Sequence, residues 1–392
     1  MDEYAAEKKQ NRFFAYIKSL PTHVKAQLWM LLIFPLNLTL ILLAKNNPDT
    51  VETLFQNGTL RFLPRVLSKI SGVLPFSLAE VLIVTAAVCG AVWLVFTVIG
   101  IIKAIKCKSG VLTKAIDFCS RIAAILLCLI FVFNIIYGLA YYRKNTSTLI
   151  YDHYIAYETE DIAFVSMYIV QEVNAARAAL DIADDTPFHL TLLKDELCKE
   201  VMTAYNFLAE DYPVYFGDYG RPKPVALSKP WTYTYIMGIY IPFTGEANYN
   251  TNIPDVELPH TILHEMAHQR SIAAEDEANF AAFLASRYSD NAEVRYSGLF
   301  ESYCFILSAL QRSDKELYEF ILSMTDDGVK TDIAAVDAFW DSYDTPLADI
   351  SNSINNAYLE SNGQEFGVSS YSLTVQYILD YYVNTYFYEY IA

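Results

Sequence analysis

Three long apolar runs in the first 144 residues constrain this chain more than any other feature. They cover roughly residues 26–44, 78–102 and 122–142, and the only charged residue of the second run is Glu80, near its start. A helix of about 20 residues crosses the roughly 30 Å hydrocarbon layer of a bilayer. Three nearly uncharged runs of this length rarely occur together as core helices of a soluble protein. The sequence therefore predicts three transmembrane helices, with a lipid bilayer as a partner.

The first run has the features of an uncleaved anchor rather than a signal peptide. It begins late, behind a mostly polar tail, and its end at Ala44-Lys45-Asn46 lacks the pattern of small residues that precedes a cleavage site. We therefore expect the first run to remain in the protein as a membrane span.

Lysine and arginine residues around the runs predict the orientation in the membrane. The first loop, residues 45–77, carries four basic residues over a long stretch. The N-terminal tail and the short second loop with its margins each carry five, namely Lys8, Lys9, Arg12, Lys18 and Lys25, and Lys103, Lys106, Lys108, Lys114 and Arg121. Because basic loops stay inside, we expect a multi-pass protein of the plasma membrane with a cytoplasmic N-terminus. Everything after Arg143 would then lie outside the cytoplasm.

The net charge changes sign where the apolar part ends. Residues 1–144 contain 16 Lys and Arg against 7 Asp and Glu, whereas residues 145–392 contain 12 against 38. An acidic surface of this kind speaks against nucleic acid as a partner, because a phosphate backbone requires basic residues. We place the boundary of the membrane domain at residue 144, with an extracytoplasmic domain over 145–392.

The predicted outer domain is mainly helical, with a small sheet. Residues 212–258 are rich in Pro, Gly, Tyr and Thr and include Tyr235–Phe243, a β-type run in which Pro242 indicates a strand at an edge or a strand end. Of the six cysteines, Cys198 and Cys304 lie in this domain, either as a disulfide or as two separate thiols. Helical apolar spacing is predicted over about 158–180, 194–210, 259–270, 275–289, 298–312, 315–324, 332–342 and 371–390.

Residues 264–268 read His-Glu-Met-Ala-His, an H-E-x-x-H motif. Residues four apart share one face of a helix, so His264 and His268 can reach the same metal ion. Glu265 lies beside the open coordination position, where it can take a proton from a metal-bound water. Leu258-Pro259 fits the start of this helix, because proline is tolerated in the first turn. The alternative is two histidines and a glutamate on a solvated helix face.

A catalytic zinc ion requires a third protein ligand, and three residues are candidates. Glu275 opens an E-x-x-x-N segment that resembles the E-x-x-x-D segment of the gluzincin metallopeptidases, in which the Glu binds zinc and the acid orients a ligand histidine. Asn279 replaces that acid here, which implies a weaker hydrogen bond to the imidazole. Glu277 is the second candidate, about 200° around the helix from Glu275. His260 is the third, but it lies about 12 Å from His268 along one helix, too far for both to bind one ion.

Glu275 can bind only if the chain turns sharply after the motif. In one straight helix over 259–289, Glu275 would lie about 10 Å beyond His268. We therefore expect Gln269–Ala274 to reverse the chain, with Ser271 either in the turn or capping the next helix. The acidic residues 275–277 also have a purely structural interpretation, because a helix dipole favours acids in the first turn.

Three further features have both a functional and a structural interpretation. The strand predicted within Tyr235–Phe243 either pairs with an extended substrate, as the edge strand of zincin peptidases does, or is an ordinary core strand. Glu246 resembles the acid that binds a substrate amino terminus in some zinc aminopeptidases. Tyr296 is either an oxyanion donor or a tyrosine packed in the core.

Three segments carry a resemblance to a known family. They are IPFTGEANYN, LPHTILHEMAHQRSIAAEDEANF and RYSG, behind the three apolar runs. The chain resembles, over nearly its whole length, the uncharacterised bacterial family known as domain of unknown function 3810, which has an HEMAHQ-like signature. The resemblance implies a bacterial membrane protein of the cell envelope with a zincin-like outer domain of zinc-peptidase type, but it supplies no substrate.

These observations predict a membrane-anchored zinc metallopeptidase of gluzincin-like type. His264, His268 and Glu275 would bind Zn²⁺, and Glu265 would activate a zinc-bound water against a peptide bond of a peptide or protein substrate outside the cytoplasm. Two other interpretations remain open. One is a catalytically weak or inactive zincin-like domain that binds a ligand or regulates a partner, and the other is a structural or signalling membrane protein in which the motif is incidental.

Overall fold

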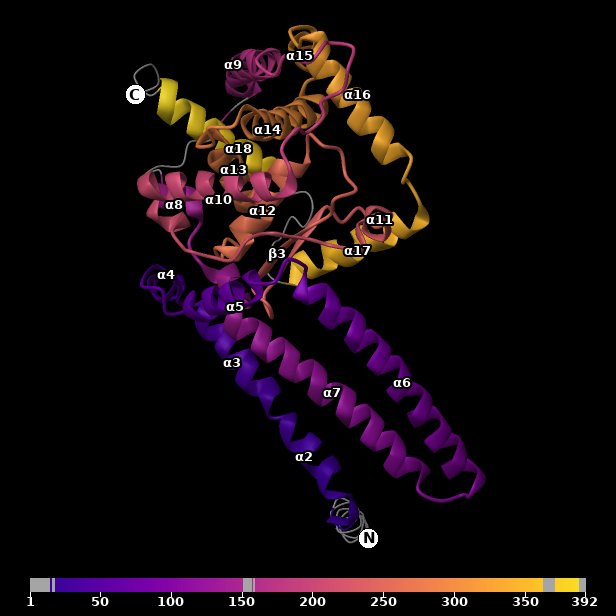
Figure 1. The fold of residues 1–392 in the computed structure, drawn as a ribbon. Helices are drawn as coiled ribbons and strands as arrows, with labels where there is room; N and C mark the ends of the chain where they lie inside the picture. The colour runs from indigo at the N-terminus through magenta and orange to yellow at the C-terminus, as the bar shows by residue number, and fades with distance from the viewer. Residues whose placement is uncertain (1–14, 16–17, 151–156, 158, 362–370, 388–392) are drawn as a thin grey trace. The chain divides into compact units, whose positions relative to one another are not determined.

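The computed structural model describes residues 15, 18–150, 157, 159–361 and 371–387. These residues are mostly helical, with one three-stranded sheet. They form two compact units (Figure 1). The first contains the described residues up to Asn47 together with Val81–Leu139, and the second contains Pro48–Glu80 and the described residues from Ala140 onward. The loop between the first two apolar runs thus belongs to the second unit, although the predicted boundary at residue 144 placed it with the membrane domain.

Three helical segments are long and apolar enough to span a membrane, as predicted. They are Thr22–Lys45, Leu78–Lys106 (α6) and Val111–Ile136 (α7). The first consists of α2 (Thr22–Met30) and α3 (Ile33–Lys45). Its break falls four residues before Pro35, where a proline ring clashes with the helix backbone. The third helix begins earlier than expected, because its first turns contain charged residues and so do not belong to the apolar run. A 3₁₀ turn (Gly138–Tyr142) follows it.

Polar and aromatic contacts join the helices of the first unit. Asn134 on α7 donates a buried hydrogen bond of 2.9 Å to Asn37 on α3. Trp93 on α6 stacks on Phe118 of α7 with ring centroids 5.4 Å apart. Side-chain amides that pair across apolar helices are typical of transmembrane packing, since hydrocarbon offers them no other partner.

The second unit contains a helix for each segment in which helical spacing was predicted. Its helices are α4 (Pro48–Gln56), α5 (Phe62–Gly72), α8 (Thr146–Ile150), α9 (Thr159–Ala178), α10 (Lys194–Asp211), α11 (Ser228–Thr232), α12 (Leu258–Gln269), α13 (Glu275–Arg287), α14 (Ala292–Ser313), α15 (Lys315–Ser323), α16 (Asp327–Asp341), α17 (Pro346–Ser361) and α18 (Tyr371–Tyr382). The longest helix that the sequence did not predict is α17, which is rich in Ser and Asn, residues of low helix propensity.

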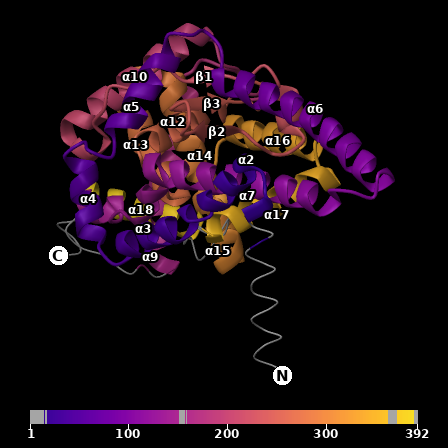
Figure 2. The same cartoon turned by 90° about the horizontal axis from the view of Figure 1, so that it is seen from below.

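The sheet is small and lies against α12 (Figure 2). Its strands are β1 (Lys223–Pro224), β2 (Gly238–Ile241) and β3 (Glu246–Tyr249), in the order β1-β3-β2. β2 is antiparallel to β3, with Gly238 opposite Tyr249 and Ile241 opposite Glu246, and β1 is parallel to β3. β2 is therefore an edge strand that ends directly before Pro242, as predicted.

Helices α12 and α13 lie in the centre of the hydrophobic core. The apolar side chains of α12 at Ile262, Leu263, Met266 and Ala267 are all buried. α13 is apolar on most of its surface and buries an unbroken run from Ala278 to Ser286. A helix buried on all sides has little freedom to shift, so the ends of α12 and α13 that face each other are firmly positioned.

The cysteines of the second unit do not form a disulfide. Cys198 is buried and Cys304 is half-buried, and both lie in the described chain as free thiols. Of the two predicted alternatives, the structure therefore has two separate thiols.

Candidate metal centre

The two histidines of the motif face the same side of α12. The helix starts at Leu258 with Pro259 in its first turn, as predicted, and it runs without interruption to Gln269. The imidazole rings of His264 and His268 lie edge to face, with centroids 4.7 Å apart and an interplanar angle of 89°. The spacing of the motif thus brings both rings to one point on the helix surface.

The chain then reverses through a turn around Ser271. The N–H of Ser271 donates to the carbonyl of His268 (2.9 Å), and the N–H of Ile272 donates to that of Ala267 (3.1 Å). This is the hydrogen-bond pattern of a Schellman motif, and Ser271 takes the left-handed conformation with φ +66° that the motif requires. The predicted reversal of the chain is therefore confirmed, and the alternative of one straight helix over residues 259–289 is wrong. Ser271 lies in the turn, while Ala274 precedes α13.

The reversal returns Glu275 to the histidines. The Nε2 atom of His264 is 3.1 Å from one carboxylate oxygen of Glu275, and the Nε2 atom of His268 is 3.6 Å from the other. One atom from each residue lies within 4.8 Å of the other two. Within the described residues, no other group of His, Cys, Asp and Glu comes together in this way. Two imidazole nitrogens and a carboxylate oxygen are a donor set that zinc accepts with one position left open.

Both rings are oriented by a contact on their far side. Nδ1 of His268 donates to the carbonyl of Ile272 (2.7 Å), which can only accept. Nδ1 of His264 donates to the side-chain oxygen of Asn279 (2.7 Å). These bonds direct each Nε2 atom toward Glu275, which is the orientation that metal ligation by a neutral imidazole requires. Asn279 therefore makes the contact that the acid of the E-x-x-x-D pattern would make.

The charges of the three residues are strongly coupled. Burial disfavours the charged form of His268, but the neighbouring Glu275 carboxylate outweighs it and raises the pKa of His268 to about 9. Burial also disfavours ionised Glu275, yet His268 and His264 hold the pKa of Glu275 below its ordinary value. The centre therefore stabilises a carboxylate next to two nitrogen donors.

Glu265 is buried between α12 and the edge strand. Its side chain lies directly over Gly238 of β2, where an added Cβ would be 2.5 Å from both Cγ and Oε1 of Glu265. Its Oε2 has no hydrogen-bond partner in the described chain. Burial raises the pKa of Glu265 to about 7, although His264 and His268 act in the opposite direction. A buried carboxyl group of this pKa, next to the metal-ligand candidates, is suited to exchange protons near neutral pH.

The other two candidates for the third ligand lie outside the cluster. Glu277 accepts a short hydrogen bond from the hydroxyl of Thr146, and burial raises its pKa to about 7. His260 is buried with its ring against Phe305, at a centroid distance of 6.2 Å, and burial lowers its pKa to about 3. The structure thus brings Glu275, and neither Glu277 nor His260, together with His264 and His268.

Residues 55–379 match the model of a protein family described as Protein of unknown function (DUF3810). The match covers most of the chain. This protein belongs to the DUF3810 family. No curated protein and no solved structure matches it. The family indicated by the three sequence segments is confirmed.

Two further candidates of the DUF3810 protein have structural roles. The carboxylate of Glu246 is buried and accepts the backbone N–H groups of Leu78 (3.1 Å) and Ala79 (2.7 Å) at the start of α6. The hydroxyl of Tyr296 donates to Asp332 at 2.5 Å in the core. These contacts support neither binding of a substrate amino terminus by Glu246 nor oxyanion donation by Tyr296. Glu246 instead holds the first turn of α6, and Tyr296 is a core residue.

Sequence patterns did not reveal the side chains that brace the turn at Ser271. Nη1 of Arg143 donates to the carbonyl of Ser271 (2.9 Å), and Arg143 also forms a buried ion pair with Glu52 of α4. The amide of Gln269 donates to the hydroxyl of Ser68 on α5 (2.8 Å) and to the carbonyl of Gly245 (2.9 Å). These partners are more than 20 residues distant in sequence, so no local periodicity could indicate them.

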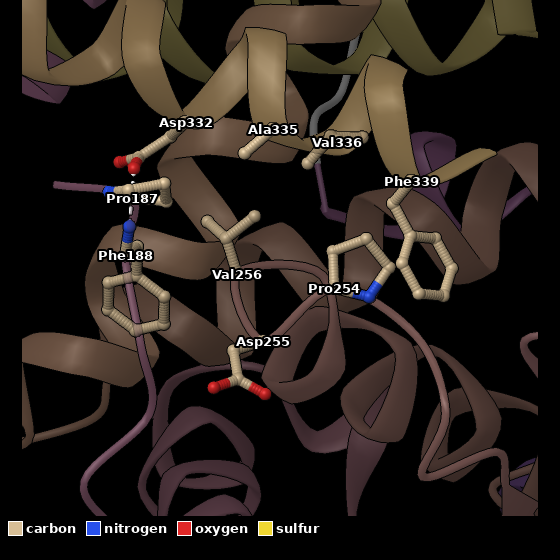
Figure 3. A pocket seen from close by; sticks show the side chains of 9 residues that line it. All are labelled: Pro187, Phe188, Pro254, Asp255, Val256, Asp332, Ala335, Val336 and Phe339. Atoms are coloured by element: carbon tan, nitrogen blue, oxygen red, sulfur yellow. Dashed lines mark hydrogen bonds between the residues drawn. The ribbon is translucent and has the colours of Figure 1, made fainter. Parts of the chain in front are cut away.

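A small pocket lies elsewhere in the second unit of the DUF3810 protein (Figure 3). Its volume is about 150 Å³, and most of its lining is apolar, from Pro187, Phe188, Pro254, Asp255, Val256, Asp332, Ala335, Val336 and Phe339. Asp332 is already bound by the N–H of Phe188 (2.5 Å) and by Arg177 (2.7 Å). The pocket shares no residue with the metal centre and offers no cluster of free polar groups.

Proposed function

We propose that the protein is a membrane-anchored zinc metallopeptidase. The convergence of His264, His268 and Glu275, with ligand atoms within 4.8 Å of one another, carries the proposal. The fit to zinc rests on this donor set and on the two Nδ1 hydrogen bonds that fix the rings. Zinc bound here supplies a Lewis acid that polarises a peptide carbonyl and acidifies water.

The proton transfers are assigned to Glu265. Its carboxylate accepts a proton from the water that attacks the carbonyl carbon, and then delivers the proton to the amide nitrogen as the C–N bond breaks. A single carboxyl group can perform both steps, because its ionised form takes up a proton and its protonated form returns it. Contact with Gly238 holds the carboxyl group in place between α12 and β2.

The edge strand supports binding of an extended substrate beside Glu265. β2 pairs with β3 on one side only, so its other side retains backbone donors and acceptors. Peptides add to such an edge as a further strand. The side chain of Ile239 is 39% exposed on this strand, which adds an apolar contact for the substrate.

The topology supports a site outside the cytoplasm. Three membrane spans place the loop after the first span and the chain after the third span on the same side, and these two parts form one compact unit. The basic residues of the N-terminal tail and of the second loop favour the cytoplasm for the opposite side. We therefore assign the zincin-like unit to the extracytoplasmic face.

Zinc analysis and one conservative variant test the proposal. We expect the purified full chain to bind one zinc ion, and His264→Ala to lose it. Glu265→Gln should retain zinc and the melting temperature but lower turnover of a fluorogenic peptide library by about 10²–10⁴-fold. Glu301→Gln, a change of a half-buried glutamate on α14 whose Oε1 atom is enclosed, is the matched control and should retain activity.

Two outcomes would reject the mechanism, namely the absence of zinc from the purified chain and an unchanged rate in Glu265→Gln. Bound zinc without any turnover would instead favour a zincin-like binding domain. The weaker hydrogen bond from His264 to Asn279, in place of one to an acid, agrees with that alternative.

A further inference from the structure

Helix α5 buries its small and polar side chains and exposes its large apolar ones. It turns Pro64, Ser68 and Ser71 into the second unit, where all three are buried. The opposite face consists of apolar side chains that are exposed, and we name this set the α5 face: Phe62 (68%), Leu63 (42%), Val66 (36%), Ile70 (64%) and, just after the helix, Val73 (83%). A surface helix of a soluble protein normally buries its apolar side and exposes its polar side.

The docking of α5 does not allow it to rotate and bury this face. Its backbone approaches two glycines so closely that a Cβ on Gly220 would lie 2.1 Å from the carbonyl oxygen of Ser68, and one on Gly245 would lie 2.5 Å from its nitrogen. The hydroxyl of Ser68 accepts hydrogen bonds from the N–H of Gly220 and from Gln269, both at 2.8 Å. Larger side chains on that side would not fit, so the exposed apolar face is a fixed feature of the fold.

The position of α5 in the chain indicates what covers this face. The helix lies between two candidate spans, Thr22–Lys45 and Leu78–Lys106. Gly72 is six positions before Leu78, so even a fully extended chain places the end of α5 within about 20 Å of the start of that span. Within the second unit, Glu246 accepts the N–H groups of Leu78 and Ala79, the residues with which that span begins. A bilayer that contains both spans therefore passes within reach of α5.

We infer that the α5 face lies in the interfacial layer of the bilayer, parallel to its plane. Phe216, 60% exposed beside Arg65, extends the apolar surface, with the Arg65 guanidinium 6.0 Å from its ring centre. An apolar face with a basic residue at its margin is the composition of helices that lie in the headgroup region. The inference does not depend on metal binding.

The same contacts link the membrane surface to the metal centre. Gln269, which donates to Ser68, directly follows the ligand candidate His268. Because a helix with its side chains is about 10 Å wide, the metal centre lies within roughly 20 Å of the lipid that covers the α5 face. If the proposed function holds, on which this step rests, the substrate is a polypeptide segment close to the membrane surface, such as the juxtamembrane part of an anchored protein.

Spin labels on the full chain test the placement of α5. The native cysteines are replaced by serine, nitroxides are attached to Val66→Cys or Ile70→Cys, and the protein is reconstituted in phosphatidylcholine–phosphatidylglycerol vesicles. Both positions should collide more with oxygen, which enters lipid, than with a water-soluble nickel chelate. Leu193→Cys, on an exposed leucine before α10 (70%), is the matched control and should show the reverse.

Equal chelate access at Val66, Ile70 and Leu193 would overturn the placement. So would mutual broadening of the labels that disappears on dilution with unlabelled protein, because a second copy would then cover the face. These measurements need neither zinc nor turnover, so their outcome is separate from that of the proposed function.

Tethered peptides test the step from placement to substrate. A peptide cleaved in the library assay is coupled to a vesicle lipid with either about 8 or about 25 residues between the bilayer and the cleaved bond. The short tether spans at most about 28 Å, enough to reach a site roughly 20 Å from the lipid, and should be cleaved at least as fast as the long one. Cleavage of the long tether only would refute a membrane-proximal site, whereas a lack of cleavage even of the free peptide would instead refute the proposed function.

Discussion

Loss of the Glu52 carboxylate should weaken both the fold and the metal centre. Glu52 on α4 forms two hydrogen bonds with Arg143, of 2.8 and 2.9 Å, and both side chains are only 5% exposed. Burial opposes the ionisation of Glu52, but Arg143 keeps its pKa below the ordinary value, so the pair is charged at neutral pH. The same guanidinium donates to Ser271, in the turn that returns Glu275 to the histidines.

The expected magnitude follows from burial. Removing one partner of a buried ion pair leaves the other charge uncompensated, which costs about 3–5 kcal/mol. Arg61 adds to this, because it is a second buried guanidinium whose charge interacts with Glu52, and its pKa is already lowered to about 10 by burial and by Arg143. We therefore expect Glu52→Ala to lie toward the upper end of that range and to weaken zinc binding by about tenfold through the loosened turn.

The assay is denaturant unfolding of the full chain in detergent, with Glu52→Ala, Arg143→Met and the double variant, together with zinc affinity from chelator competition. The coupling energy between the two sites should be about 2–3 kcal/mol. Asp49→Ala is the matched control on the same helix, since Asp49 pairs with Lys144 at an exposed site where solvent screens the charges, and it should leave the free energy of unfolding nearly unchanged. If Glu52→Ala were as mild as Asp49→Ala, or if the coupling energy were zero, the bracing role assigned to the pair would be refuted.

Three further predictions address other parts of the second unit. Gly238→Ala should displace Glu265 and lower turnover by about 100-fold with zinc content unchanged, whereas Gly90→Ala, which has open space around it, should have no effect on either; equal rates would contradict the contact. Asn279→Ala should weaken zinc affinity by about 10–100-fold in chelator competition, because the ring of His264 loses its acceptor; an unchanged affinity would show that this bond does not orient the ring. Burial raises the pKa of Glu301 and of its neighbour Glu257, so folding favours the protonated forms of this pair. The stabilisation is complete below the ordinary pKa of a glutamate and is lost as the pH rises through the raised pKa values, so Glu301→Gln should reduce the fall of the melting temperature over that range; an unchanged pH dependence would contradict this.

Local sequence patterns were sufficient for the apolar spans, for most helices of the second unit and for two of the three ligand candidates. The apolar runs predict helices because each depends only on the composition of neighbouring residues, and the spacing of His264 and His268 depends only on the helical repeat. The edge position of β2 could also be predicted, since Pro242 cannot donate to a neighbouring strand. By contrast, α17 was missed because it is rich in Ser and Asn, which have low helix propensity, so local preference gives no helix signal there.

The sequence by itself thus determined three apolar helices, a mainly helical second unit and a pair of histidines on one helix face. Only the tertiary structure decided that Glu275 rather than Glu277 meets those histidines, and that α4 and α5 belong to the same unit as the candidate metal centre. The physical reason is distance along the chain. Residues a few positions apart determine which side chains share a helix face. The turn at Ser271, by contrast, is also held by a hydrogen bond from Arg143, and the position of Gln269 is held by its hydrogen bond to Ser68. Only folding brings these distant partners together.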